Sequence, residues 1–361
     1  MGKLIIQAYN VHQGGGKILL DTLLGFGFPG KDWVLLVDSR MRIPSLSTGS
    51  CQIRKINPSI WSRLKAEWWL ARNAGKDDTV LCFGNLPPIF KSAARVQVFL
   101  QNRYLIEPVC LSEFHWKIKL RISVERFWLN YKAVNSDQFI VQTPSMKCAL
   151  ETWLLRHSAK NLQSGTPKKK TATIQVLPFI SNADGYERRL TTIQQETEKE
   201  FDFIYVASGE PHKNHHRLIE AWCILAQEGV FPSLCLTLDK DRFSVLCEWI
   251  EKKSVQYRLK LQIFNIMPHG QILQLYGRVK AMIYPSTFES FGLPLVEARQ
   301  KGLPILAPEL DYVRDLIDPD QTFDPESVIS ISRSVKRFLN MDDSPLHLLN
   351  AEEFAKYIIL Q

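Results

Sequence analysis

The sequence contains no apolar run of the roughly 18 residues that a membrane-spanning helix requires, and residues 1–30 show no signal-peptide pattern. Its seven cysteines form no CxxC pair, which argues against a disulfide or zinc framework and predicts reduced thiols in a cytoplasmic protein. There is no low-complexity tract and no repeat of solenoid length. With 45% hydrophobic and 23% charged residues, the chain is predicted to fold as a soluble protein.

The net charge of +8 is divided unevenly along the chain. Residues 1–170 contain 25 Lys and Arg against 11 Asp and Glu, a balance of +14, whereas the remainder contains 20 against 26, a balance of −6. Such an asymmetry predicts that the first half faces an anionic partner. No nucleic-acid recognition module is visible. An anionic membrane surface is therefore the expected partner, and nucleic acid is not.

Short β-rich runs alternate with helical stretches along most of the 361 residues. They occupy residues 3–10, 33–39, 79–85, 96–102 and 138–143 in the first half, and 201–208, 233–239, 259–265, 281–286 and 303–308 in the second. Nearly continuous apolar runs of this kind predict parallel strands buried on both faces. The pattern favours an α/β protein with two doubly wound, Rossmann-like domains facing across a cleft, at 1–165 and 166–345, followed by a terminal helix at 346–361.

Two acids flank a predicted helix start in "FESFGLPLVE", residues 288–297. Pro294 suits the first turn of a helix, so the backbone amides before it would offer free donors to a phosphate, supported by the helix dipole. Glu289 and Glu297 would repel that phosphate but could each accept hydrogen bonds from the hydroxyls of a sugar diol. On spacing alone, both acids are equally compatible with surface positions near a helix start.

A second polar stretch, "VASGEPHKNHHRLIEAW", follows the strand at 201–208. A helix is expected from about Asn214, with Leu218, Ile219 and Trp222 facing the core. Lys213 stands at the turn before it, on the edge of the sheet where the phosphates were placed, and a flexible ammonium suits a diphosphate leaving group. A solvated lysine at a helix start is the alternative interpretation.

Taken together, these motifs resemble the group 1 glycosyltransferases of GT-B fold, bacterial surface-polysaccharide type, which are retaining enzymes that use nucleotide-sugar donors. Their E-x7-E motif matches Glu289 and Glu297, and their "EPRKN"-type donor-phosphate motif is matched by "EPHKN" with Lys213 in the lysine position. The resemblance extends from about residue 201 to 326 and is weaker in the first half. Many members carry an arginine some residues before the lysine, where this chain reads "VASGE".

The resemblance implies a role for each matched residue. Glu289 would serve the donor sugar near its reacting carbon, with Lys213 as the second catalytic residue, and Glu297 would bind the ribose. The diphosphate would lie against Ser290, Phe291, Gly292 and Leu293. No metal ion and no other cofactor is expected, although "DKD" at 239–241 leaves open a metal-dependent alternative.

The first half offers two further candidate segments. "YNVHQGGGKILLDTLL" places Gly14, Gly15 and Gly16 between a strand and a helix, and in the resembling family glycines at this point let the loop approach the donor phosphates or the acceptor. A tight strand-to-helix turn is the alternative. A second strand ends in Gln101, Asn102 and Arg103, which are candidates for contact with the acceptor or the donor sugar. Basic, tryptophan-rich segments at 61–76 and 114–132 suit either an interfacial helix or an ordinary amphipathic one.

The sequence therefore predicts a retaining, metal-independent hexosyltransferase. It would move a hexose from a UDP- or GDP-linked donor to a glycan or lipid-linked acceptor in cell-surface polysaccharide or lipopolysaccharide synthesis, at the inner face of the cell membrane. A sugar-nucleotide epimerase or phosphorylase of similar fold is one alternative. A non-catalytic glycan- or nucleotide-binding module is the other.

Overall fold

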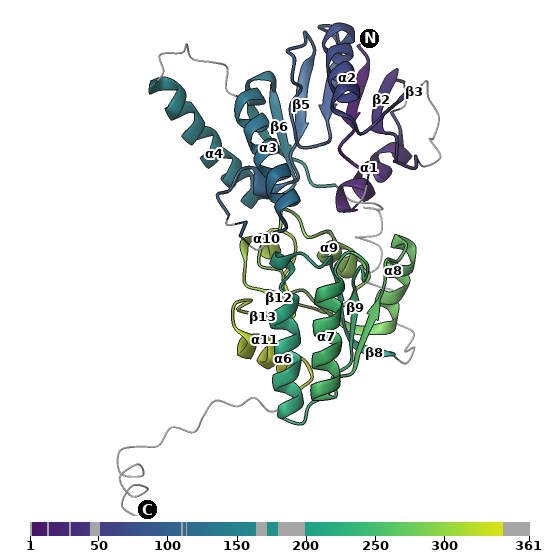
Figure 1. Ribbon diagram of the computed structural model, residues 1–361, viewed down its shortest axis with the longest axis vertical. Coiled ribbons are helices and arrows are strands. Elements are labelled where there is room, and N and C mark those ends of the chain that lie inside the picture. Colours follow the sequence, from purple (N-terminus) through teal and green to yellow (C-terminus); the bar gives the residue numbers. More distant parts are fainter. Residues whose placement is uncertain are drawn as a thin grey trace, which may run out of the picture.

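A computed structural model describes residues 2–12, 14–28, 30–43, 51–109, 111–112, 114–163, 172–179 and 199–341. Two domains follow one another along the long axis of the molecule (Figure 1). Each is built on one parallel sheet covered by helices. The fold is thus the predicted pair of doubly wound α/β domains.

The first domain contains a seven-stranded sheet in the order β3-β2-β1-β4-β5-β6-β7. Its strands are β1 (Leu4–Ala8), β2 (Trp33–Asp38), β3 (Cys51–Ile56), β4 (Thr79–Cys82), β5 (Arg95–Phe99), β6 (Gln138–Val141) and β7 (Thr173–Val176). Its helices are α1 (Gly14–Phe26), α2 (Ile60–Asn73), α3 (Trp116–Lys132) and α4 (Pro144–Gln163), with short 3-10 turns η1 (Arg103–Leu105) and η2 (Ala133–Asn135). Alternate strand residues pack into separate cores on the two faces, as Ile5 and Ile6 of β1 do.

The second domain contains a six-stranded sheet in the order β10-β9-β8-β11-β12-β13. Its strands are β8 (Phe201–Val206), β9 (Leu234–Thr237), β10 (Leu261–Phe264), β11 (Val279–Ile283), β12 (Ile305–Pro308) and β13 (Gln321–Phe323). Its helices are α6 (His215–Gln227), α7 (Ser244–Tyr257), α8 (His269–Leu275), α9 (Leu293–Gln300), α10 (Asp311–Arg314) and α11 (Val328–Phe338), with turns η3 (Pro211–Lys213) and η4 (Tyr276–Arg278). The side chains of Leu218, Ile219 and Trp222 on α6 are buried as predicted.

Both strand orders reverse direction beside a central strand, and ligands of such sheets bind at that reversal, beyond the carboxyl ends of the strands. In the first sheet β1 lies between β2 and β4, and in the second β8 lies between β9 and β11. The glycine loop follows β1, the Lys213 turn follows β8 and the Glu289 loop follows β11. The topology therefore places all three polar segments at the two reversal points.

Three strands were not predicted, and they form the outer edges of the sheets: β3 and β7 of the first, and β13 of the second. Because β7 pairs with β6 in parallel, the first sheet extends beyond the predicted domain boundary between 165 and 166. The segment at 157–173, which contains that boundary, begins inside α4 and ends at the start of β7. The terminal helix predicted at 346–361 lies outside the described residues.

Candidate active site

One cavity of about 620 Å³ lies between the two domains. It is lined by every residue that the sequence singled out for catalysis, donor binding or acceptor contact: Gly14, Gly15, Gly16, Gln101, Asn102, Arg103, Lys213, Glu289, Ser290, Phe291, Gly292, Leu293 and Glu297. These residues come from segments that lie up to about 280 positions apart in the chain. Their convergence is a fact of the structure, whereas the role of each one stays a prediction.

Lys213 and Glu289 meet as an ion pair inside this cavity. The Lys213 ammonium donates to Glu289 Oε1, and their side chains are only 14% and 11% exposed. Tyr284 donates its hydroxyl to the same carboxylate at 2.8 Å. Burial by itself would raise the pKa of Glu289. The charge of Lys213, together with His212 and hydrogen bonds, outweighs this effect of burial, so the pKa of Glu289 is lowered. Glu289 is therefore a carboxylate at neutral pH.

The turn that carries Lys213 is fixed by the loop that carries Glu289. Thr287 donates its backbone amide to the carbonyl of His212 at 2.9 Å, and Ser286 donates its hydroxyl to that carbonyl at 3.1 Å. Asn214, in the left-handed conformation with φ 61°, donates its amide to Pro285 at 3.1 Å and to Pro325 at 2.8 Å. Asparagine tolerates this conformation better than most residues, which explains its place after Lys213.

Helix α9 begins beside this pair. Gly292 is its N-cap with φ 69°, and Pro294 lies in its first turn. The first backbone amides of a helix have no partner within it and carry the positive end of the dipole. They line the cavity next to Lys213, and a phosphate bound at this end of α9 stays a prediction.

Glu297 is the fifth residue of α9 and is 7% exposed. Its Oε1 is 2.7 Å from His269 Nε2, and Tyr276 donates its hydroxyl to Oε2 at 3.3 Å. The hydrogen bond to Glu297 raises the pKa of His269, although burial acts in the opposite direction. Sequence reasoning missed His269. Its position directly after β10, at the start of α8, was the available signal, because that edge of the sheet faces the cleft.

The glycine loop needs glycine at two of its three positions. Gly14 has φ 73°, a conformation that side chains rarely adopt. At Gly16 a Cβ atom would lie 3.3 Å from Gln101 Oε1, so glycine lets helix α1 approach the end of β5. Gly15 is free of both constraints and simply leaves open space at the cavity wall.

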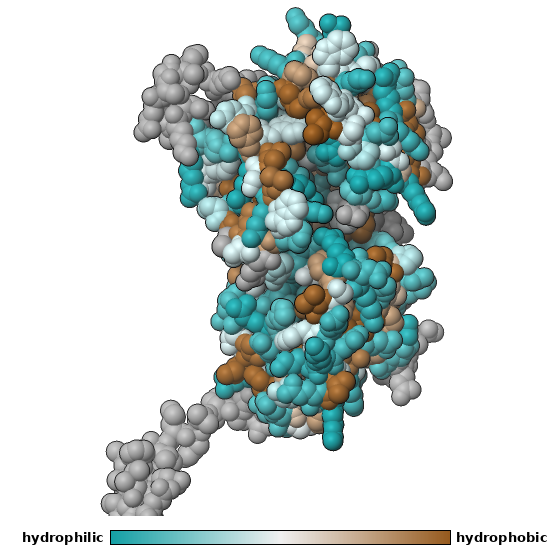
Figure 2. Space-filling model, in the orientation of Figure 1, coloured by the Kyte–Doolittle hydropathy of each residue, from teal (hydrophilic) through white to brown (hydrophobic). Residues whose placement is uncertain are grey.

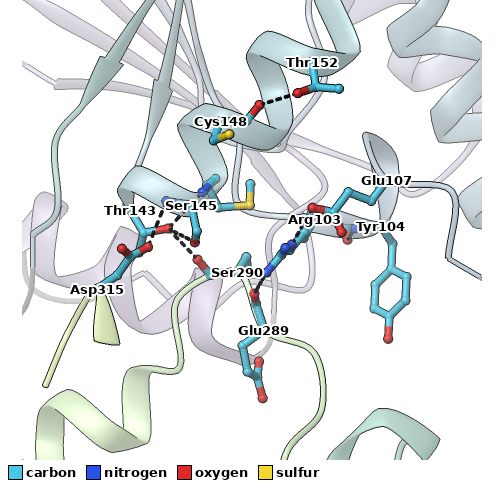
Figure 3. A network of polar contacts seen from close by, with 12 residues as sticks. Arg103, Tyr104, Glu107, Thr143, Ser145, Cys148, Thr152, Glu289, Ser290 and Asp315 are labelled. Atoms are coloured by element: carbon cyan, nitrogen blue, oxygen red, sulfur yellow. Dashed lines mark hydrogen bonds and ion pairs between the residues drawn. The ribbon is translucent and has the colours of Figure 1, made fainter. Parts of the chain in front are cut away.

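Arg103 connects the two domains at the Glu289 loop (Figure 3). It donates to the backbone carbonyl of Glu289 at 3.3 Å, pairs with Glu107 at 2.8 Å, and lies over the ring of Phe288 at 4.9 Å. Thus its guanidinium holds the loop backbone, a contact that the sequence did not predict.

A second bridge between the domains lies beside the first in Figure 3. Asp315 accepts a hydrogen bond from the backbone amide of Ser145 at 2.8 Å, at the start of α4. Thr143 donates its hydroxyl to the carbonyl of Ser290 at 3.5 Å. Asp315 therefore caps a helix of the opposite domain.

His215, the first residue of α6, is buried and has its pKa lowered to about 3, first by burial and then by Lys213. No group of three or more His, Cys, Asp or Glu side chains within the described ranges is arranged to hold a metal ion. In the "DKD" segment, Asp239 accepts the backbone amides of Asp241 at 3.1 Å and Arg242 at 2.9 Å. Its carboxylate thus shapes its own loop.

The fold and this cavity together define the chain as a GT-B protein. Sucrose-phosphate synthase from Thermosynechococcus elongatus superimposes with a TM-score of 0.65 over 94% of this chain and 90% of that one, at 14% identity. HepE of Anabaena, solved in complex with UDP and glucose, superimposes with a TM-score of 0.58 over 94% and 90%, also at 14% identity.

Residues 188–354 match the family model described as glycosyl transferases group 1. The second domain is therefore similar to the group 1 glycosyltransferases. The chain is 26% identical over 228 residues to the serotype-specific mannosyltransferase WbdA of Escherichia coli. This match covers 61% of this chain and 27% of that protein. It is also 26% identical over 156 residues to O-antigen chain mannosyltransferase B of Escherichia coli, covering 42% of this chain and 40% of the relative. The chain thus spans about a quarter of the length of the WbdA proteins that it matches.

Proposed function

We propose that the chain is a retaining, metal-independent glycosyltransferase that moves a hexose from a nucleotide sugar to a glycan or lipid-linked acceptor of a cell-surface polysaccharide. The observation that carries this proposal is the Lys213–Glu289 pair beside the start of α9. Mannose is the favoured sugar, because the WbdA relatives, matched over 228 to 233 residues, are named mannosyltransferases.

Each group in the cavity has a task in such a reaction. The bond between the anomeric carbon and the diphosphate breaks while the acceptor oxygen takes its place, through an oxocarbenium-like state. Lys213 and the amides of α9 stabilise the negative charge that develops on the departing diphosphate. The carboxylate of Glu289 faces the positive charge on the sugar. Glu297 binds the ribose, and in doing so exchanges its contact with His269 for one with the donor.

Turnover of labelled donors tests this proposal directly. Protein is incubated with GDP-mannose, UDP-glucose or UDP-N-acetylglucosamine and a membrane extract as the source of acceptor. Transfer of label to the extract, with nuclear magnetic resonance showing an α-linked product from an α-linked donor, is the expected result. Interconversion of the donor without transfer would instead identify an epimerase. A donor that stabilises the protein by mass action without turnover would identify a binding module.

Metal independence rests on Lys213 and the start of α9 as the positive groups beside the diphosphate. Transfer is expected to survive excess EDTA, and Asp239→Asn is expected to keep most of it. Activity lost in EDTA and restored by manganese would show that a metal ion is required, and would disprove this part of the proposal.

Docking on the cytoplasmic face of an anionic membrane is the second part of the proposal. Along α3, Trp116, Leu120, Val124, Phe127 and Tyr131 repeat at helical spacing and are 54–65% exposed. Figure 2 shows hydrophobic residues gathered on the face of the first domain over which α3 runs in Figure 1. None of the helices in the described part of the chain is long and apolar enough to span a membrane.

Helix α2 adds aromatic and basic groups to the same domain. Trp61 and Trp68 are 77% and 52% exposed, and Arg72 stacks over the ring of Trp68 at 4.1 Å. Aromatic rings interleaved with basic residues suit the boundary of an anionic bilayer. Binding to vesicles containing anionic lipid is expected to weaken as salt rises, and to fall in Phe127→Ser. Absence of binding at low salt would refute the docking.

A further inference from the structure

One residue in an unusual backbone conformation stands at the wall of the cavity on the side of the first domain. Asn85 lies three positions after the end of β4, lines the cavity, and has φ 71°, in the left-handed region. Asparagine adopts this conformation more readily than most residues, because its short polar side chain can form local hydrogen bonds. The contacts of the Asn85 side chain show what the conformation achieves.

The side-chain oxygen of Asn85 holds the segment that follows the neighbouring strand. Its Oδ1 accepts the backbone amide of Gln101 at 2.5 Å and that of Asn102 at 2.9 Å, just beyond the end of β5. Because both donors are N–H groups, the atom that faces them is the amide oxygen. Pairing between β4 and β5 ends at Cys82 and Val98. Asn85 therefore continues the connection between the two strands beyond their last pair.

The segment held by Asn85 carries the contact to the second domain. Arg103 follows directly and donates to the backbone carbonyl of Glu289 at 3.3 Å (Figure 3). The side chain of Asn102 caps the short turn η1 in which Arg103 lies. The position of Arg103 therefore depends on where Asn85 holds the two residues before it.

The loop that follows Asn85 has supports of its own. Helices α2 and α3 and the turn η2 each hold one of its residues: Glu67 accepts the backbone amide of Ile89 at 2.7 Å, Trp128 donates its indole N–H to the carbonyl of Pro87 at 2.8 Å, and Asn135 donates to the carbonyl of Pro88 at 2.8 Å. A change of the Asn85 side chain is therefore expected to leave this loop in place and to remove only the two contacts with the end of β5.

We propose that Asn85 is a positioning residue for the transfer reaction. Its side chain fixes residues 101–103, and Arg103 in turn holds the backbone of Glu289 beside the reacting sugar. This inference rests on the proposed function and adds to it a residue that touches neither donor nor acceptor. The nucleotide would be bound by Glu297 and the start of α9, both in the second domain. Loss of the Asn85 side chain is thus expected to lower kcat and to leave the affinity for the nucleotide unchanged.

Asn85→Gly tests the proposal on full-length protein. Glycine adopts the left-handed conformation freely, so this variant loses the oxygen and keeps the backbone. Its kcat for transfer from labelled donor is expected to fall roughly 10- to 100-fold, the effect of a small displacement of a reacting group. Its affinity for GDP or UDP, measured by calorimetry, is expected to equal that of the wild type. Because Asn85 acts through Arg103, the double variant Asn85→Gly/Arg103→Ala should be no slower than Arg103→Ala alone.

Amide hydrogen exchange follows the same contacts without turnover. Asn85→Gly is expected to speed exchange at residues 101–103 and also at 287–292 of the other domain. Asn85→Asp should restore protection in both segments, because a carboxylate accepts the same two amides and aspartate tolerates the conformation. Asn340→Gly is the matched control, because Asn340 is also left-handed, with φ 53°, and follows α11 instead of lining the cavity. It is expected to keep wild-type kcat and exchange.

Several results would overturn the proposal. They are a wild-type kcat in Asn85→Gly, full additivity with Arg103→Ala, unchanged exchange at 287–292, and an equal loss of kcat in Asn340→Gly. Failure of every nucleotide sugar to bind or turn over with the wild type would instead overturn the proposed function. Exchange at 287–292 would still decide whether Asn85 holds the loop of Glu289.

Discussion

The buried ion pair between Lys213 and Glu289 offers the sharpest test of the site. Lys213→Met leaves Glu289 with the hydroxyl of Tyr284 at 2.8 Å as a remaining partner, in surroundings where its side chain is only 11% exposed. Glu289→Gln leaves Lys213 equally uncompensated. Removing one partner of a buried ion pair destabilises a protein by about 3 to 5 kcal/mol. At roughly 2 to 4 °C per kcal/mol for a chain of this kind, each single variant is expected to melt roughly 6 to 20 °C below the wild type.

The double variant Lys213→Met/Glu289→Gln separates pairing from other causes. Because it leaves neither charge unpaired, its loss of stability should be smaller than the sum of the two single losses, by at least about 1 kcal/mol. Activity should respond differently, because in the proposed reaction Lys213 contacts the diphosphate and Glu289 contacts the sugar. Each variant should show a kcat reduced roughly 10- to 150-fold, equivalent to about 1.5 to 3 kcal/mol for a charged hydrogen bond.

Equilibrium unfolding in urea measures the stabilities, and steady-state kinetics with varied donor measures kcat. Tyr205→Phe is a useful control, because it removes a hydrogen bond of 2.7 Å to the backbone carbonyl of Lys213 without changing any charge. Stability losses that simply add in the double variant would refute the coupling between the two charges. Wild-type kcat in Glu289→Gln would refute its place beside the reacting carbon.

Three further outcomes follow from the structure. Glu297→Gln is expected to raise the donor KM by roughly 10- to 150-fold with little change in kcat, because ribose contacts are alike in ground and transition states; a fall in kcat alone would contradict this. The hydrogen bond to Glu297 raises the pKa of His269 in the folded protein. Protonated His269 therefore stabilises the fold fully below the unfolded pKa of about 6.5, and this stabilisation is lost as the pH rises through the higher pKa of the folded state. The melting temperature of His269→Gln should therefore depend less on pH between 6 and 9 than that of the wild type, and an unchanged dependence would argue against the pairing. Asp315→Ala removes the cap that the second domain provides to α4, and small-angle scattering is expected to show a larger radius of gyration; an identical scattering profile would show that this contact does not hold the domains together.

Much of the fold could be predicted because the inner strands carry their own signal. β1, β2 and β8 lie between two neighbouring strands and beneath helices on both faces, so their sequences are nearly continuous apolar runs. The edge strands β3, β7 and β13 have a neighbour on one side only, and exposed residues such as Lys55 and Gln175 stand between half-buried ones. Because these strands are not buried on both faces, they contain no continuous apolar run. Strand β7 was therefore not predicted, and the boundary between the two domains was placed too early in the chain.

The sequence by itself determined the local geometry of the candidate site. The spacing of Glu289 and Glu297 across a helix start, and the position of Lys213 in the turn after β8, depend on neighbours within a few residues, and such short-range features are visible in a sequence. Only the tertiary structure decided which side chains meet across the cleft. His269 reaches Glu297, and Arg103 reaches the Glu289 loop. These contacts depend on strand order and on the packing of one domain against the other, because residues far apart in the chain are brought together only when both sheets have formed.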